Sequence, residues 1–219
     1  MPIIYRNDGE EYATAVWHIT ETITELAMLH PHGAAWLLSV SEIPDHLRAR
    51  KLVEKLLIET LCPQQAEAFA HTPTGRPYLK SLSTQISLSH TRDLVGLEIS
   101  RTSAPGIDLE YVSPRVTRLL PRVCVPEELE LLHTAPYPTD VTATLIWCAK
   151  EAMFKAAQDR ISTISQVRVT HMAKAPLPYI RATLTTENAE EKYFGYTRLD
   201  QHCLLVHSLP TCRISLIDK

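Results

Sequence analysis

The chain has 219 residues, of which 45% are hydrophobic and 21% are charged, and its formal net charge is -3. A chain of this length forms one or two domains, and its apolar content is sufficient for a buried core. The small negative charge and the lack of a long basic run argue against bulk electrostatic capture of nucleic acid or of an anionic membrane.

The first half of the chain predicts a strand, a helix and two further strands. Residues 34–40 form an apolar run, which predicts a buried strand. Pro44 then opens a helical stretch that ends near Cys62, because its leucines recur close to helical spacing. Two short strands are predicted at 85–89 and 94–100, joined by a polar connection.

The second half predicts one strand at 106–111, a group of helices and a run of strands. The prolines between 114 and 138 predict two short helices, at 115–123 and 127–133. A longer helix begins near Asp140 and ends after Asp159. Strand-like runs follow at 165–170, 179–185, 193–198 and 203–207. This order of elements predicts an α+β fold. A division near 101–105 gives two halves of similar plan, residues 1–103 and 104–219.

The N-terminus and the cysteines indicate the compartment. The first eleven residues are polar and charged, unlike a signal peptide, and no apolar run approaches the ~20 residues that a membrane-spanning helix needs. The cysteines are odd in number and lack paired metal-ligand spacing, which favours free thiols: Cys62, Cys124, Cys148, Cys203 and Cys212. We therefore expect a soluble cytoplasmic protein without a membrane anchor.

Two acidic residues alternate with apolar residues in the predicted strand at 106–111. Ile107 and Leu109 alternate with Asp108 and Glu110, so both carboxylates project from one face while the other face is buried. An ordinary solvated face would show the same pattern. Carboxylate oxygens are also the ligands that Mg²⁺ prefers in proteins.

A second motif lies on the long predicted helix, at Trp147–Lys155. Trp147, Glu151 and Lys155 follow one another at four-residue spacing and form one ridge beside an apolar stripe. If this helix crosses near the acidic strand, three carboxylates and a lysine converge, as a divalent cation and a phosphorylated substrate require. The alternative for Lys150, Glu151 and Lys155 is ordinary pairing on the helix surface.

Two weaker motifs contain groups that bind phosphate oxygens. The segment Ser87-Leu88-Ser89-His90 offers a hydroxyl and an imidazole, and Gly75-Arg76-Pro77 offers a guanidinium. Each has an ordinary alternative, a polar strand end and a turn. Together with the two stronger motifs they indicate a diphosphate or a nucleotide bound with a divalent ion.

The four motifs, in this order between residues 75 and 155, resemble the signature set of the 4′-phosphopantetheinyl transferases, of the larger, surfactin-synthetase-activating (Sfp) type. The resemblance implies a magnesium site at Asp108, Glu110 and Glu151. It implies coenzyme A contacts at Arg76, Ser89, His90 and Lys155, and catalytic roles for Glu151 and Lys155. The implied fold has two similar α/β halves with the active site in the cleft between them, in a protein that acts as a monomer.

The activity implied by the resemblance is transfer of 4′-phosphopantetheine from coenzyme A to a serine of an apo acyl or peptidyl carrier protein, releasing adenosine 3′,5′-bisphosphate. Two alternatives stay open: a magnesium-dependent phosphohydrolase, and a non-catalytic protein that binds coenzyme A or a carrier. We expect Cys148 to serve packing, and Arg115, Arg118 and Arg122 to contact the carrier or to form a solvated helix face. Relatives of this family bind adenine and the 3′-phosphate with basic residues, which here stay unassigned among Arg6, Arg48, Arg50, Lys51 and Lys55.

Overall fold

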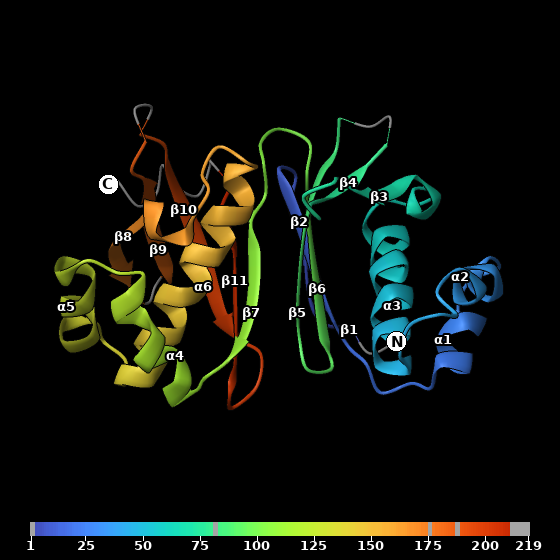
Figure 1. The fold of residues 1–219 in the computed structure, drawn as a ribbon, viewed down its shortest axis with the longest axis horizontal. Helices are drawn as coiled ribbons and strands as arrows, with labels where there is room; N and C mark the ends of the chain where they lie inside the picture. Colours follow the sequence, from blue (N-terminus) through green and yellow to red (C-terminus); the bar gives the residue numbers. More distant parts are fainter. Residues whose placement is uncertain (1–2, 81–82, 175–176, 187–188, 211–219) are drawn as a thin grey trace.

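The computed structural model describes residues 3–80, 83–174, 177–186 and 189–210. Two antiparallel sheets lie against each other in the middle of the molecule, and each is covered on its outer side by a long helix (Figure 1). These helices are α3 (Asp45–Leu61) and α6 (Thr139–Ala157). The expected α+β class is confirmed, while the similarity of the two halves stays a prediction.

The N-terminal sheet has the strand order β1-β2-β6-β5 within the described residues. Its strands are β1 (Ile3–Asp8), β2 (Tyr12–His18), β5 (Gln85–Thr91) and β6 (Leu94–Ser100). Strands β5 and β6 were predicted, whereas β1 and β2 were not. The predicted helix after Pro44 is α3, which packs on β2 and β6 through buried residues such as Leu52, Leu57 and Ile58. The smaller elements of this half are α1 (Ile23–Met28), α2 (Gly33–Ser39), β3 (Phe69–His71) and β4 (Pro77–Leu79).

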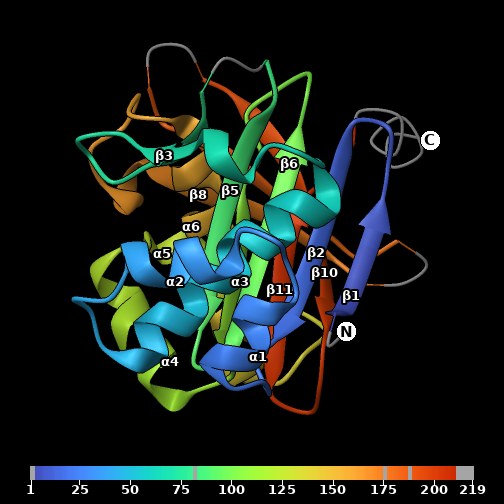
Figure 2. The same cartoon turned by 90° about the vertical axis from the view of Figure 1, so that its right-hand side faces the viewer.

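The prediction of a buried strand at 34–40 is wrong, because this segment forms helix α2. Trp36 is 4% exposed and Leu38 is 74% exposed, so the run is buried on one side only. A buried strand would cover both of its faces, whereas a short helix of alanine and leucine needs one apolar face and is made of strong helix formers. Figure 2 shows α2 beside α1 and α3 on the outside of the N-terminal sheet.

The C-terminal sheet has the order β7-β11-β10-β9-β8 within the described residues. Its strands are β7 (Ile107–Tyr111), β8 (Val167–Ala173), β9 (Tyr179–Leu184), β10 (Glu191–Arg198) and β11 (Cys203–Ser208). The helices are α4 (Pro114–Leu119), α5 (Pro126–Thr134) and α6. The helices and strands predicted for this half are therefore present, with small shifts at their ends.

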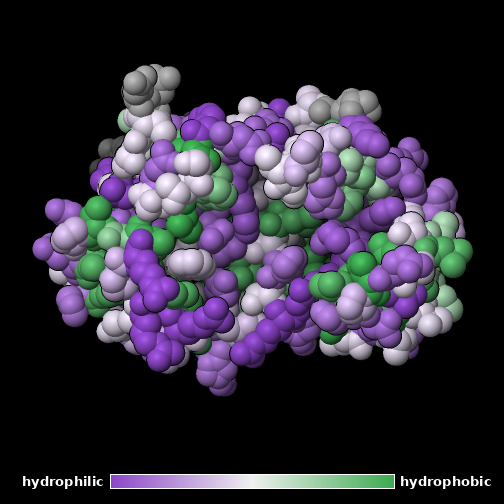
Figure 3. All heavy atoms as spheres, in the orientation of Figure 1, coloured by the Kyte–Doolittle hydropathy of each residue, from purple (hydrophilic) through white to green (hydrophobic). Residues whose placement is uncertain are grey.

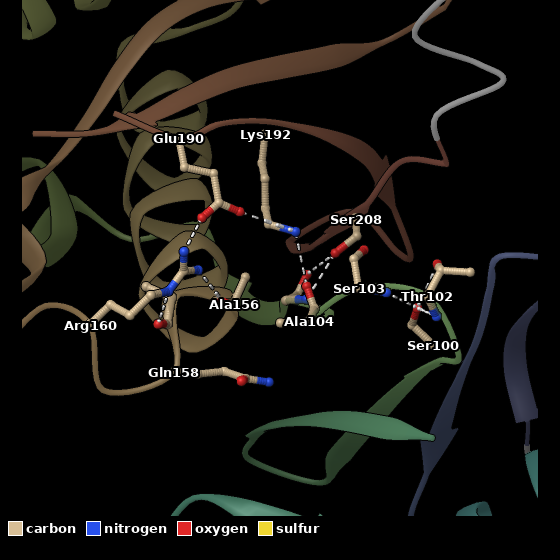
Figure 4. A network of polar contacts seen from close by, with 12 residues as sticks. Ser100, Thr102, Ser103, Ala104, Ala156, Gln158, Arg160, Glu190, Lys192 and Ser208 are labelled. Atoms are coloured by element: carbon tan, nitrogen blue, oxygen red, sulfur yellow. Dashed lines mark hydrogen bonds and ion pairs between the residues drawn. The ribbon is translucent and has the colours of Figure 1, made fainter. Parts of the chain in front are cut away.

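Strand β7, which carries the first of the two strongest motifs, lies at the boundary between the sheets. A small apolar cluster joins Val16 and Leu94 of the first sheet to Ile107 and Leu109 of β7. The connection from β6 to β7 is held by Lys192 of β10, whose ammonium donates to the carbonyl oxygen of Ala104 at 3.1 Å (Figure 4).

Gly106 lets β7 start close against α6. A Cβ atom at this position would lie 2.1 Å from the carbonyl oxygen of Ala152 in the helix, so only glycine allows this approach. The acidic strand is thereby brought alongside the helix that carries Glu151 and Lys155.

Two expectations about the compartment can be compared with the structure. In the described part of the chain, no helix is both long enough and apolar enough to cross a membrane. Cys62, Cys124, Cys148 and Cys203 are free thiols, as predicted, and Cys212 lies outside the described residues.

Candidate active site

The site begins where helix α6 lies against strand β7. The Lys155 ammonium is 2.8 Å from Asp108 Oδ1 and donates to the carbonyl oxygen of Ile107 at 2.9 Å. Asp108 is buried, whereas the Lys155 side chain is 27% exposed. The structure therefore brings the acidic strand and the lysine of the helix together, and the lysine keeps one side open to solvent.

The negative charge of Asp108 acts on the other two carboxyl groups of the predicted set, those of Glu110 and Glu151. Burial raises the pKa of Glu110 to about 7, and the negative charges of Asp108 and Glu151 contribute to this rise. Burial and the charge of Asp108 also raise the pKa of Glu151. The three side chains thus repel one another, although the Lys155 ammonium offsets part of this repulsion.

A cavity of about 580 Å³ opens over these groups, between the two halves of the chain. Figure 3 shows the surface hollowed there, with hydrophilic side chains along parts of the rim. The N-terminal half contributes Lys51, Glu54, His71 and His90, and the C-terminal half contributes Asp108, Glu110, Trp147, Glu151 and Lys155. A cavity of this size can hold a nucleotide-sized ligand.

Ser89 takes part in the site through Asp108. Its hydroxyl donates to Asp108 Oδ1 at 2.9 Å, and its oxygen accepts the backbone N–H of Leu109 at 3.1 Å. The hydroxyl proton is therefore already used and is not free for a phosphate oxygen. The coenzyme A contact of Ser89 stays a prediction that requires this proton to be redirected.

His90 follows Ser89 and lines the cavity itself. Burial lowers the pKa of His90, and the nearby charges of Arg50 and Lys155 lower it further. The imidazole is therefore neutral at neutral pH and can offer one N–H donor to a ligand.

Arg76 lies in a pocket of about 300 Å³ that adjoins the main cavity through Lys155 and Gly75. Its Nε atom is 3.5 Å from Asp159 Oδ2, at the end of α6. Arg76 is thus near the predicted site, and it keeps donors for a phosphate group because its Nε atom has no hydrogen-bond partner.

The interpretation of Lys150 as a surface residue is wrong. Lys150 is fully buried, forms an ion pair with Glu128 Oε1 at 2.7 Å and donates to the carbonyl oxygen of Val167. The sequence contained a signal for this, because Ile146, Lys150 and Met153 share helical spacing and all are buried. Lys150 fixes α5 and β8 to helix α6. Cys148 is also fully buried, as expected for packing, and burial raises the pKa of its thiol.

Comparison with known proteins agrees with this geometry. Residues 104–206, which run from β7 to β11, match the family model of the 4′-phosphopantetheinyl transferase superfamily. The C-terminal half of the chain is thus similar to this superfamily. It is 24% identical to enterobactin synthase component D of Salmonella typhi over 189 residues, which cover 78% of each chain. It is 27% identical to the protein of that name from Salmonella typhimurium over 182 residues, covering 74% of this chain and 75% of the relative. The 4′-phosphopantetheinyl transferase HetI of Nostoc is 30% identical over 108 residues, or 46% of each chain.

The carboxylates of the site fit a hard cation, although they are not arranged as a finished metal site. Among the residues that the structure describes, no three His, Cys, Asp or Glu side chains form a group that could hold a metal ion. However, Asp108 Oδ2 is buried without a hydrogen-bond partner, and Glu110 and Glu151 flank it with raised pKa values. An unsatisfied oxygen beside mutually repelling carboxyl groups is the donor set that suits Mg²⁺.

We expect Glu110→Gln to melt higher than the parent at about pH 8 in EDTA, and at the same temperature at about pH 4. In the folded protein the pKa of Glu110 is raised from 4.5 to about 7, so the folded state binds this proton more tightly than the unfolded state does. The resulting stabilisation is complete below pH 4.5 and is lost as the pH rises through 7. After allowance for solvent screening, the gain above pH 7 is about 1 kcal/mol, or about 2–4 °C. Scanning calorimetry at both pH values tests this, and an equal difference at both would contradict it.

Proposed function

We propose that the protein uses this cavity to transfer 4′-phosphopantetheine from coenzyme A to a serine hydroxyl of an apo carrier protein, releasing adenosine 3′,5′-bisphosphate. The observation that carries the proposal is the contact between Lys155 and Asp108 at the base of a cavity lined from both halves. It combines a positive group for phosphate with a carboxylate that has one unpaired oxygen.

In the proposed reaction, the serine oxygen forms a bond to the β-phosphorus of coenzyme A, and the bond from that phosphorus to the bridging oxygen breaks. The bridging oxygen leaves with the electron pair on adenosine 3′,5′-bisphosphate. When bound to Asp108, Glu110 and Glu151, magnesium would stabilise the charge on the diphosphate. The ammonium of Lys155 binds the transferring phosphoryl group.

Glu151 is the proposed acceptor of the serine proton. Its pKa is raised by burial, which makes the free carboxylate a stronger base than an exposed glutamate. Binding of magnesium would weaken this base, so a water molecule held by Glu151 is the alternative first acceptor of the serine proton.

The test is mass spectrometry of a panel of apo carrier proteins incubated with coenzyme A and magnesium. The proposal expects one carrier to gain the mass of the phosphopantetheine arm at its serine. A parallel incubation without a carrier should leave coenzyme A intact. Release of the bisphosphate in that second incubation would favour a phosphohydrolase, and no gain on any carrier would overturn the transferase proposal.

A smaller pocket beside the cavity is the proposed contact for the carrier. This pocket, of about 320 Å³, is lined by Arg92, Tyr111, Arg115 and Trp147, and it shares Glu110 with the main cavity. The guanidinium of Arg92 lies over the Tyr111 ring at 4.1 Å. Of the three arginines predicted to contact the carrier, Arg115 lines this pocket, whereas Arg118 and Arg122 do not.

We expect Arg115→Glu to raise the carrier KM by about tenfold and to leave the coenzyme A KM unchanged. Carrier proteins are generally acidic, so reversing a positive charge at the mouth of the site replaces attraction with repulsion. Arg118→Glu should have a smaller effect, and Arg198→Glu, an exposed arginine on β10 outside the pocket, serves as the control. Steady-state kinetics with the carrier varied would contradict the assignment if all three variants gave the parent KM.

The proposal includes magnesium as the ion, a monomeric chain, a cytoplasmic location and halves that divide into residues 1–103 and 104–219. The free thiols support the compartment, and the start of the family match at residue 104 supports the division. Lys51 is the proposed contact for the nucleotide end of coenzyme A, because it lines the cavity, where its ammonium also pairs with Glu54 Oε2 at 2.8 Å. Of the other basic candidates, Arg48 pairs with Asp45 and Lys55 lies over the Trp36 ring.

A further inference from the structure

Strands β5 and β7 are edge strands of their sheets, and they meet at the boundary between the two halves. An edge strand presents backbone N–H groups without a ladder partner. Here side chains of the N-terminal half accept those of β7. Ser87 Oγ accepts the N–H of Ile107 at 3.2 Å, and Ser89 Oγ accepts the N–H of Leu109 at 3.1 Å. The side chains of these two serines, two residues apart on β5, thus take the place of the backbone hydrogen bonds that a neighbouring strand would form with β7.

Glu98 on β6 continues this arrangement at the start of β7. Its Oε2 atom accepts the backbone N–H of Gly106 at 3.0 Å and that of Ser208, at the end of β11, at 3.2 Å. Glu98 is fully buried, and its Oε1 atom accepts the hydroxyl of Thr14 at 3.3 Å. We call Glu98, Ser87 and Ser89 the acceptor row. Each member binds a main-chain N–H of residues 106–109.

Asp108 lies between the amides that the acceptor row holds. Any shift of β7 along or away from β5 therefore moves the Asp108 carboxylate relative to Glu151 and Lys155, which are attached to α6. The Asp108 side chain itself is held at Oδ1 by Ser89 and Lys155, and this leaves Oδ2 unpaired. The direction of the unpaired oxygen thus depends on the backbone position of β7.

We propose that Ser87 and Glu98 are positioning residues for the reaction, which set Asp108 for metal binding by holding the open edge of β7. The inference rests on the proposed function, since it concerns the carboxylate assigned there to magnesium. Ser87 does not line the main cavity, and Glu98 is fully buried on β6. Both hold the backbone of β7, and Ser87 also lines the adjoining pocket that contains Arg76.

Ser87→Ala tests the inference, with binding of Mn²⁺ measured by electron paramagnetic resonance in the intact protein. Loss of the hydroxyl leaves the Ile107 N–H without its acceptor, so β7 shifts toward another partner. We expect Mn²⁺ affinity to fall by about tenfold, the lower end of the range for residues that orient metal ligands. The magnesium concentration for half-maximal activity should rise by the same factor, while the coenzyme A KM changes less. Ser87→Thr keeps the hydroxyl and should restore both values.

Thr22→Ala is the matched control. Thr22 Oγ1 also accepts a backbone N–H, that of Glu25 at 3.3 Å, but at the start of α1 in the N-terminal half. This variant should lose stability without a change in Mn²⁺ affinity. If Ser87→Ala does not fold, Ser87→Cys, with a weaker acceptor, should show a smaller fall in affinity.

The outcomes separate the inference from the proposed function. Parental Mn²⁺ affinity in Ser87→Ala or Ser87→Cys would overturn the positioning role and leave the transferase proposal standing. A parent that transfers phosphopantetheine without binding Mn²⁺ or Mg²⁺ would overturn the metal assignment, and the positioning role with it.

Discussion

Asp108→Ala is expected to lower turnover by at least ~100-fold, the scale of losing a main electrostatic contributor to a transition state. Three features of the structure place this residue at the centre of the site. Its Oδ1 atom binds both Lys155 and Ser89, its Oδ2 atom is unpaired, and its charge raises the pKa values of Glu110 and Glu151. Alanine removes the proposed metal ligand and leaves the Lys155 ammonium without its counter-charge.

Three further variants show which other charged groups of the cavity contribute to turnover. Glu151→Ala and Lys155→Ala should lose turnover on a similar scale, because each removes a charged group from the cavity wall. Glu110→Gln should lose less, since an amide oxygen can still coordinate a cation. Turnover is measured at saturating coenzyme A and carrier, and circular dichroism confirms that each variant is folded. Near-normal turnover of Asp108→Ala would remove the metal assignment.

The parts of the site that were predictable depend on local periodicity. Alternation of Ile107 and Leu109 with two acids identified β7, and four-residue spacing of Glu151 and Lys155 identified the face of α6 that lines the cavity. These signals depend on backbone geometry within a few residues, so tertiary contacts did not change them. The contact between β7 and α6 was expected from the complementary charges of the two motifs. Gly106 is the residue that permits it.

The parts that were not predictable depend on contacts between segments far apart in the chain. The Ser89 side chain has a hydroxyl of the kind that binds phosphate. This hydroxyl instead donates across the boundary between the sheets to Asp108, 19 positions later in the chain. Arg76 is held by Asp159, which follows it by more than eighty residues. No local pattern states which partner such a polar side chain finds. The prediction of a strand at 34–40 was wrong for a related reason, because packing against other helices decides that this apolar run is buried on one side only.

Helix α6 carries the buried ammonium of Lys150 directly next to Glu151, whose carboxyl group lines the cavity. Glu151 faces the cavity, whereas Lys150 points into the core, because neighbouring residues on a helix are turned by about 100°. The partner of Lys150, Glu128, is itself buried and accepts the backbone N–H groups of Val125 at 3.0 Å and Val169 at 2.7 Å. This carboxylate therefore fastens α5, α6 and β8 together at one point.

We expect Glu128→Ala to lower the free energy of unfolding by about 3–5 kcal/mol, which is the usual result of removing one member of a buried ion pair. The Lys150 ammonium would stay fully buried with only the Val167 carbonyl oxygen as its partner, and two backbone N–H groups would lose their acceptor. At about 2–4 °C per kcal/mol, the melting temperature should fall by about 10 °C. Urea denaturation and calorimetry measure both quantities.

The double variant Glu128→Leu with Lys150→Met is the control for this prediction. It removes both charges and fills the space with apolar side chains, so it should recover a large part of the stability that the single variant loses. Because Lys150 and Glu128 do not line the cavity, the double variant should also keep turnover near the parental value well below its melting temperature. A single variant that loses less than about 1 kcal/mol would show that the pair is not the buried link described here, since that loss is typical of an exposed ion pair. If the double variant regained stability but not turnover, Lys150 would have a role in the reaction beyond holding the catalytic helix against α5 and β8.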